Sequence, residues 1–154
     1  MNKTLAKPSR RRVALACALA ATCLTASAVA RSSPAPVIGG AADIRVEDAW
    51  IHALPGPVSV AYATFVNSSD MPVNVVDASA AIAAWVELDR TTGPHRMMRV
   101  KNFYIKPHSS LSLQANQLHM SLNRPKSALT KGEQVPILLK FSDGSSVTVP
   151  FEVR

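Results

Sequence analysis

The sequence predicts an all-β protein, a single-domain antiparallel β-sandwich with Greek-key connections, and three observations support this fold class. After residue 42, apolar side chains alternate with period two in short segments, which is typical of half-buried strands. Turn residues separate these segments at spacings of about 8–12 residues. No segment has a sustained helical period, and only the alanine-rich residues 78–84 could form one helical turn.

The expected strands can be followed along the chain. Residues 58–66 alternate and end at the turn 67–70, residues 85–88 precede the turn 91–94, and Leu111 and Leu113 lie in a further strand. The last pair is the clearest: residues 135–141 and 147–153 alternate on either side of Asp143-Gly144, which predicts a β-hairpin. About eight or nine strands are expected, as in a sandwich.

Residues 1–30 are expected to be a cleavable export signal. Five Lys and Arg residues precede the apolar residues 13–24, and Ala28-Val29-Ala30 is a small-residue cleavage site. An uncleaved membrane anchor is the less favoured alternative, and the choice between the Sec and twin-arginine routes stays open. A lipoprotein signal is also less favoured, because the residues before Cys17 and Cys23 lack its leucine. Residues 31–42 read as a flexible lead-in to a domain at 43–154.

Charge and cysteine content change when the expected signal is removed. The net charge of +7 falls to +2, because all five charges of residues 1–30 are positive. This removes most of the support for a nucleic-acid partner. Both cysteines also lie in the signal, so the mature domain has no disulfide and no thiolate metal site. Any metal ligands must therefore be His, Met or carboxylate side chains.

No enzymatic motif is found. The chain has no phosphate-binding glycine loop, no nucleophile elbow and no zinc-protease histidine pair. Glu87 and Asp89 share one strand face and could do acid–base chemistry, but a solvated outer face is the favoured interpretation. We therefore expect a protein that is not an enzyme.

The one unusual cluster consists of histidines and methionines. Imidazole and thioether groups suit Cu(I), a soft ion that accepts low coordination numbers. The alternative is that the methionines fill the core and the histidines lie on the surface. The cluster comprises His95, Met97, Met98, His108, His119 and Met120.

The order of several segments makes the chain resemble a known family. These segments are residues 46–51, 61–67, 86–88, 98–99, 118–120 and 129–139. In this succession the chain resembles the periplasmic copper chaperones of the PCu(A)C family, over residues 46–153. The resemblance implies a cupredoxin-like β-sandwich that binds Cu(I) at an exposed His/Met site. It also implies delivery of the ion to a copper centre such as that of a cytochrome oxidase subunit.

The chain departs from the metal motif of that family, which is a His, ten residues, a Met, about 21 residues and then His-x-Met. The four matching positions here are Asp89, Val100, His119 and Ser121, so the resemblance carries over one ligand, His119.

Neighbouring residues could compensate for the lost ligands. Met98 lies two residues before Val100, so on a strand it shares that residue's face, whereas Met97 and Met120 should point the opposite way to Met98 and His119 respectively. His95 follows Gly93-Pro94 and could replace the missing first His. We therefore predict a Cu(I) site formed by His119, Met98 and His95. His52 and His108 are expected at the surface.

The predicted function is that of an exported, periplasmic, monomeric Cu(I) chaperone-like protein, with no membrane insertion after signal cleavage. The alternative is a family member that has lost metal binding and acts as a periplasmic protein-interaction module. Asp89, Val100 and Ser121 motivate this alternative.

Overall fold

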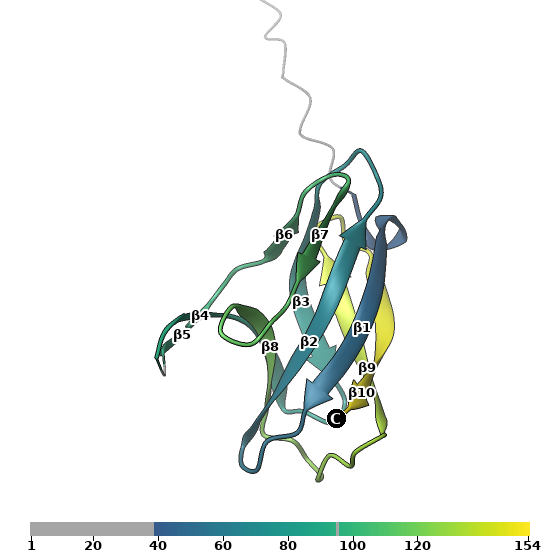
Figure 1. The fold of residues 1–154 in the computed structure, drawn as a ribbon. Coiled ribbons are helices and arrows are strands. Elements are labelled where there is room, and N and C mark those ends of the chain that lie inside the picture. The colour runs from purple at the N-terminus through teal and green to yellow at the C-terminus, as the bar shows by residue number, and fades with distance from the viewer. Residues whose placement is uncertain (1–38, 95) are drawn as a thin grey trace, which may run out of the picture. The chain divides into compact units, whose positions relative to one another are not determined.

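The computed structural model describes residues 39–94 and 96–154, which form a domain of strands (Figure 1). One 3-10 turn, η1, precedes ten strands. In order these elements are η1 (Ala41–Asp43), β1 (Ile44–His52), β2 (Val58–Asn67), β3 (Val73–Ala80), β4 (Trp85–Gly93), β5 (Arg96–Arg99), β6 (Phe103–Ile105), β7 (Ser109–Ser112), β8 (Leu118–Asn123), β9 (Gln134–Phe141) and β10 (Ser146–Val153).

The strands form one sheet that curls on itself. Its order is β5-β4-β8-β2-β1-β10-β9-β3-β6, and β7 pairs with β2 beside β8. β3 contacts β4 and β6 contacts β7, so the two ends of the strand order approach each other and enclose the core. The sandwich fold class is confirmed. One pair of strands, β1 and β10, is parallel, with Trp50 opposite Glu152 and Ile51 opposite Val153.

The core lies inside this curl. Burial alternates along the strands, as β9 shows, where Val135, Ile137, Leu139 and Phe141 are buried and the intervening residues are more exposed. Burying each such side chain stabilises the fold by about 1.5–3 kcal/mol. The largest fully buried side chains are Phe65, Phe103, Phe151, Ile51, Ile105, Met120, Leu122, Ile137 and Leu139.

The clearest strand predictions are confirmed, and two local ones are wrong. The final hairpin and the strand at residues 58–66 are present as β9–β10 and β2. The turn expected at 91–94 is displaced, because β4 continues to Gly93 by pairing with β5. Residues 78–84 form no helical turn: the first three of them belong to β3, where they pair with β9.

The beginning of the domain is tied to the sheet. Gly39 bridges Val73, and the Gly40 amide donates a hydrogen bond to the Asp43 carboxylate at 2.9 Å. The predicted signal, residues 1–30, lies outside the described residues, as do residues 31–38 of the expected lead-in. In the part of the chain that the structure describes, no helix has the length and apolar character needed to cross a membrane.

Candidate metal centre

The residues of interest lie on a hairpin at one end of the sheet. β5 pairs only with β4 and is an edge strand, with Asp89 opposite Arg99, Arg90 opposite Met98 and Thr91 opposite Met97. All four β5 residues are exposed. In Figure 1 this hairpin projects away from the rest of the sheet. Its strands are held by backbone pairing and not by burial of a shared apolar face.

His119 lies on β8, directly opposite Asp89 on β4. Its side chain is only 3% exposed, and its Nδ1 lies 3.2 Å from the Gln117 carbonyl oxygen. A carbonyl can only accept, so Nδ1 carries the proton and donates. In a neutral ring this contact leaves the Nε2 lone pair to bind a metal ion.

Three of the four family ligand positions share one face of the β4–β8 pair. Asp89 is opposite His119, and Ser121 lies two residues further along β8 on the same face. The Ser121 hydroxyl donates to Asp89 Oδ2 at 2.6 Å, and both side chains are buried. The fourth position, Val100, packs against the core. At the three family ligand positions on this face, the chain therefore has one histidine and a hydrogen-bonded Ser–Asp pair instead of His and Met ligands.

The structure does not bring the predicted ligands Met98 and His119 to a common face. Met98 is 52% exposed but pairs with Arg90, the neighbour of Asp89, so its side chain lies on the opposite face. Met97, 62% exposed and opposite Thr91, is the methionine on the His119 face. Met120 is fully buried in the core, as expected.

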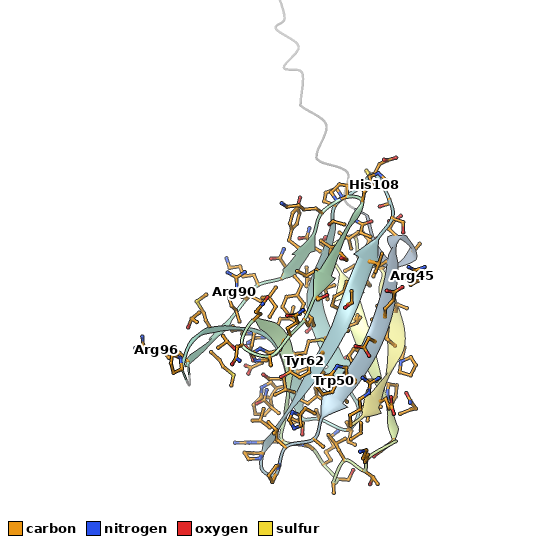
Figure 2. The ribbon with its side chains drawn as sticks, in the orientation of Figure 1. Arg45, Trp50, Tyr62, Arg90, Arg96 and His108 are labelled. Atoms are coloured by element: carbon orange, nitrogen blue, oxygen red, sulfur yellow. The ribbon has the colours of Figure 1, made fainter. Side chains whose placement is uncertain are left out.

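Two further placements concern histidines. His95, the third predicted ligand, lies outside the described residues. His52 and His108 are exposed, as expected, and His108 Nε2 lies 2.7 Å from an Asp70 carboxylate oxygen. Figure 2 shows His108 far from Arg96 of the hairpin. Within residues 39–94 and 96–154, no group of three His, Cys, Asp or Glu side chains is placed to hold a metal ion.

Two aromatic side chains, Trp50 of β1 and Tyr62 of β2, lie on the His119 face, on the side of β8 away from β4. Val60 of β2 pairs with Ser121, so Tyr62 shares that face, and its ring lies 4.7 Å from the ring of Trp50 (Figure 2). Partial burial raises the pKa of the Tyr62 phenol above its ordinary value, because burial disfavours the charged phenolate. Both rings line a hollow of about 280 Å³.

The hairpin itself is basic. Arg90, Arg96, Arg99 and Lys101 are all exposed on or beside it. Arg90 and Arg96 lie along its length in Figure 2. Of these four side chains, only Arg99 forms an ion pair with another described residue, Glu87, at 3.8 Å.

Sequence reasoning placed Met97 on the face away from Met98 but did not place it with His119, and it assigned Asp89 no clear role. The alternation rule was applied correctly to Met98 and Val100, which do share a face. Alternation alone could not show that the face of Met98 and Val100 is not the face of His119, because the relative placement of these faces depends on the register of β5, β4 and β8. The pairing of Asp89 with His119 supplies that register.

Solved structures with a similar fold define the class of this domain. The copper-bound PCuAC domain from PmoF2 matches with a TM-score of 0.64 at 21% identity, covering 77% of this chain and 95% of that one. The solution structure of CuI-DR1885 from Deinococcus radiodurans matches with a TM-score of 0.60 at 31% identity, covering 82% of this chain and 83% of that one. The fold is that of the copper chaperone-like PCu(A)C proteins.

Sequence comparisons give the family. A family model described as "Putative lipoprotein LpqE-like" matches residues 44–153. A protein of Leifsonia xyli subsp. xyli, "Putative lipoprotein Lxx21020", is 30% identical over 136 residues, covering 85% of this chain and 82% of that protein. The chain belongs to the LpqE-like family, a PCu(A)C-type family, with an incomplete His/Met motif.

Proposed function

We propose that this domain is an exported copper chaperone-like protein that binds Cu(I) through His119 and thioether side chains of β5. Two of the similar structures support copper as the cargo, since one is a copper-bound PCuAC domain and the other is CuI-DR1885. The family and its Leifsonia relative are both named as lipoproteins, which supports an exported, envelope-associated, periplasmic location.

The observation that carries the proposal is the 3.2 Å contact between His119 Nδ1 and the Gln117 carbonyl oxygen. The Nδ1–H is committed to that carbonyl, so the Nε2 lone pair is the available one. Soft thioether ligands stand on the adjacent hairpin, and Met97 is our first candidate because it shares the His119 face. Met98 and His95 remain candidates from the same hairpin. Exposed methionines suit a carrier that must release its cargo.

The recipient is proposed to be a copper centre such as that of a respiratory oxidase subunit, approached by a monomeric domain. We propose no catalytic step. Transfer would require only that a partner offer ligands to an ion held by few protein groups. An open site with two or three ligands allows such an exchange.

A Cu(I) competition titration of the mature protein tests the ligand set. One Cu(I) per chain is expected, with binding lost in His119→Ala and weakened about tenfold or more in Met97→Leu, a loss of 1.4 kcal/mol or more. Met98→Leu and His95→Ala are measured alongside, and His52→Ala is the matched control. Stoichiometry below about a tenth with native folding intact would contradict copper binding.

A gain-of-function variant tests the same site from the other direction. Asp89→His with Ser121→Met replaces the hydrogen-bonded pair by the ligands that the family motif has at these positions. We expect Cu(I) affinity to rise by tenfold or more, about 1.4 kcal/mol. An unchanged affinity in a folded double variant would show that this face does not contribute to copper binding.

The second candidate function is a protein-interaction module without metal. The short bond between Ser121 and Asp89 favours it, because this bond occupies two of the positions where ligands are expected. Capture of an envelope partner with and without a copper chelator separates the two functions. Partner binding that is unaffected by chelator and by His119→Ala would favour the module.

A further inference from the structure

Among the described residues, no strand pairs with the outer edge of β5, so backbone groups there can hydrogen-bond to a partner. The Val100 amide donates to the Leu88 carbonyl at 2.8 Å, and Met98 lies opposite Arg90 two residues earlier. Antiparallel strands alternate between residues that bond to the partner and residues that point away. Met97 and Arg99 are of the second kind, so their N–H and C=O groups point outward from the end of the sheet.

The side chains of this edge are basic and have only one acidic partner. Arg96 and Arg99 of β5, Arg90 of β4 and the following Lys101 are all exposed. In the part of the chain that the structure describes, Glu87 alone lies within ion-pair distance of any of them. Asp89, the nearest buried carboxylate, already accepts a hydrogen bond from Ser121. The edge therefore has positive charge available for a partner.

Arginine side chains alone would be an ordinary protection against strand-to-strand association at an edge. Here two methionines accompany them, one on each face of β5 and each more than half exposed. Thioether side chains are flexible and adapt to the surface that they contact. A strand laid along the edge would be flanked by a methionine on either face.

We propose that the outer edge of β5 binds an extended acidic segment of a partner protein by β-strand addition. Backbone bonds to Met97 and Arg99 would supply affinity, and the arginines would select carboxylates. An anionic membrane could use the same charges, but lipid headgroups would not form a strand ladder with the unpaired backbone groups of β5. The proposal rests on the proposed function in one respect: the partner is the copper recipient, brought beside the β5 thioethers.

Binding is tested on the metal-free mature protein with synthetic peptides. The probes are an alternating Glu-Val peptide, a Lys-Val peptide and an N-methylated Glu-Val peptide that keeps its charge but cannot complete a ladder. Titration followed by backbone NMR should show the Glu peptide shifting β5 amides and binding about tenfold or more tightly than both controls. Binding should weaken as salt is raised.

Two matched pairs of variants separate charge from backbone pairing. Arg96→Glu with Arg99→Glu should reduce Glu-peptide binding about tenfold or more, whereas Lys106→Glu with Lys131→Glu, the same change of net charge elsewhere, should change it less than about twofold. Met97→Pro removes an outward N–H and should abolish binding, whereas Met97→Leu retains it.

Several outcomes would overturn the proposal. They are no Glu-peptide binding up to about 1 mM, equal binding of the N-methylated peptide, or binding only to phosphatidylglycerol vesicles, which would identify a membrane surface. Because the peptides are measured without metal, the result is independent of the Cu(I) titration. Peptide binding without Cu(I) binding would support the docking edge and contradict the copper role. Cu(I) binding without peptide binding would support the copper role and contradict the docking edge.

Discussion

Two hairpins of the same sheet are built in opposite ways. In β9–β10, seven residue pairs are in register, β9 buries alternate side chains, and Phe151 and Val153 are buried at the end of β10. In β4–β5, three pairs are in register, a fourth follows after a bulge between Thr91 and Gly93, and all of β5 is exposed. The first hairpin is stabilised by the core that it helps to form. The second has an outer strand whose side chains are available to solvent.

The difference shows where this domain can accept change without unfolding. The β5 side chains contribute little burial, so substitutions there should alter binding more than stability. The boundary between the buried and the exposed part of this hairpin lies on β4, where Asp89 is buried against Ser121 and its neighbour Arg90 is exposed. The proposed docking edge lies on the exposed side of this boundary, whereas the proposed copper site would join the buried His119 to exposed methionines of β5.

The largest expected effect is the loss of a core side chain from β10. Phe151→Ala should lower the free energy of unfolding by about 3–5 kcal/mol, because it leaves a cavity where a fully buried ring was. Met98→Ala on β5 should change it by no more than about 0.5 kcal/mol. Urea denaturation of both variants measures this, and comparable losses would contradict the contrast between the hairpins.

The next effect concerns the base of the β4–β5 hairpin. Ser121→Ala removes the 2.6 Å hydrogen bond to Asp89 and should cost about 1–3 kcal/mol, because the carboxylate stays buried without this donor. Chemical denaturation again gives the value. Ser110→Ala, at an exposed serine of β7, is the control and should be close to neutral. A neutral Ser121→Ala would mean that Asp89 finds another donor or water.

The contrast also explains how far sequence reasoning could go. The β9–β10 hairpin was predictable because one face is buried, so apolar residues alternate along residues 135–141 and 147–153. Asp143-Gly144 also indicates the turn between them. β5 has no buried face and therefore no pattern. Its pairing extends β4 to Gly93, a feature that the local sequence, rich in turn residues, argued against.

The candidate site was predictable in part for the same reason. His119 was identified through the family resemblance, and the burial of Met120 followed from alternation. The sequence favoured Met98 over Met97, and the structure places Met97 on the His119 face instead, because this placement depends on how β5 is aligned with β4 and β4 with β8. The bond between Ser121 and Asp89 joins residues 32 positions apart, and nothing local encodes it.

A smaller effect is expected from backbone conformation in the two hairpins. Gly144 has φ +88° in the β9–β10 turn, a left-handed conformation, so Gly144→Ala should destabilise the fold by about 1–2 kcal/mol. Gly93, near the tip of β4–β5, has no left-handed φ, and no described residue would contact an added Cβ, so Gly93→Ala should be neutral or stabilise by about 0.4–1 kcal/mol. Thermal unfolding compares the two. Equal losses would show that the second hairpin is as constrained as the first.

The smallest effect is a change of pKa in the β9–β10 turn. Ser145 donates to Asp143 Oδ1 from its hydroxyl at 2.6 Å and from its amide at 2.9 Å, and these bonds lower the pKa of the Asp143 carboxyl. Ser145→Ala removes the hydroxyl and should raise that pKa toward its usual value of about 3.9. Carboxyl ¹³C NMR titration measures the shift, with Ser146→Ala as the control.

The sign of the linked stability change follows from the lowered pKa. The ionised Asp143 is favoured in the folded state, so its contribution is present above the unfolded pKa and is lost as the pH falls through the folded one. Ser145→Ala should therefore flatten the loss of stability below about pH 4 and leave the slope at neutral pH unchanged. A pKa for Asp143 that does not move in Ser145→Ala would show that the amide donor alone holds it down. The β9–β10 turn would then be held by a backbone hydrogen-bond donor, the Ser145 amide, just as β5 is held by backbone pairing with β4.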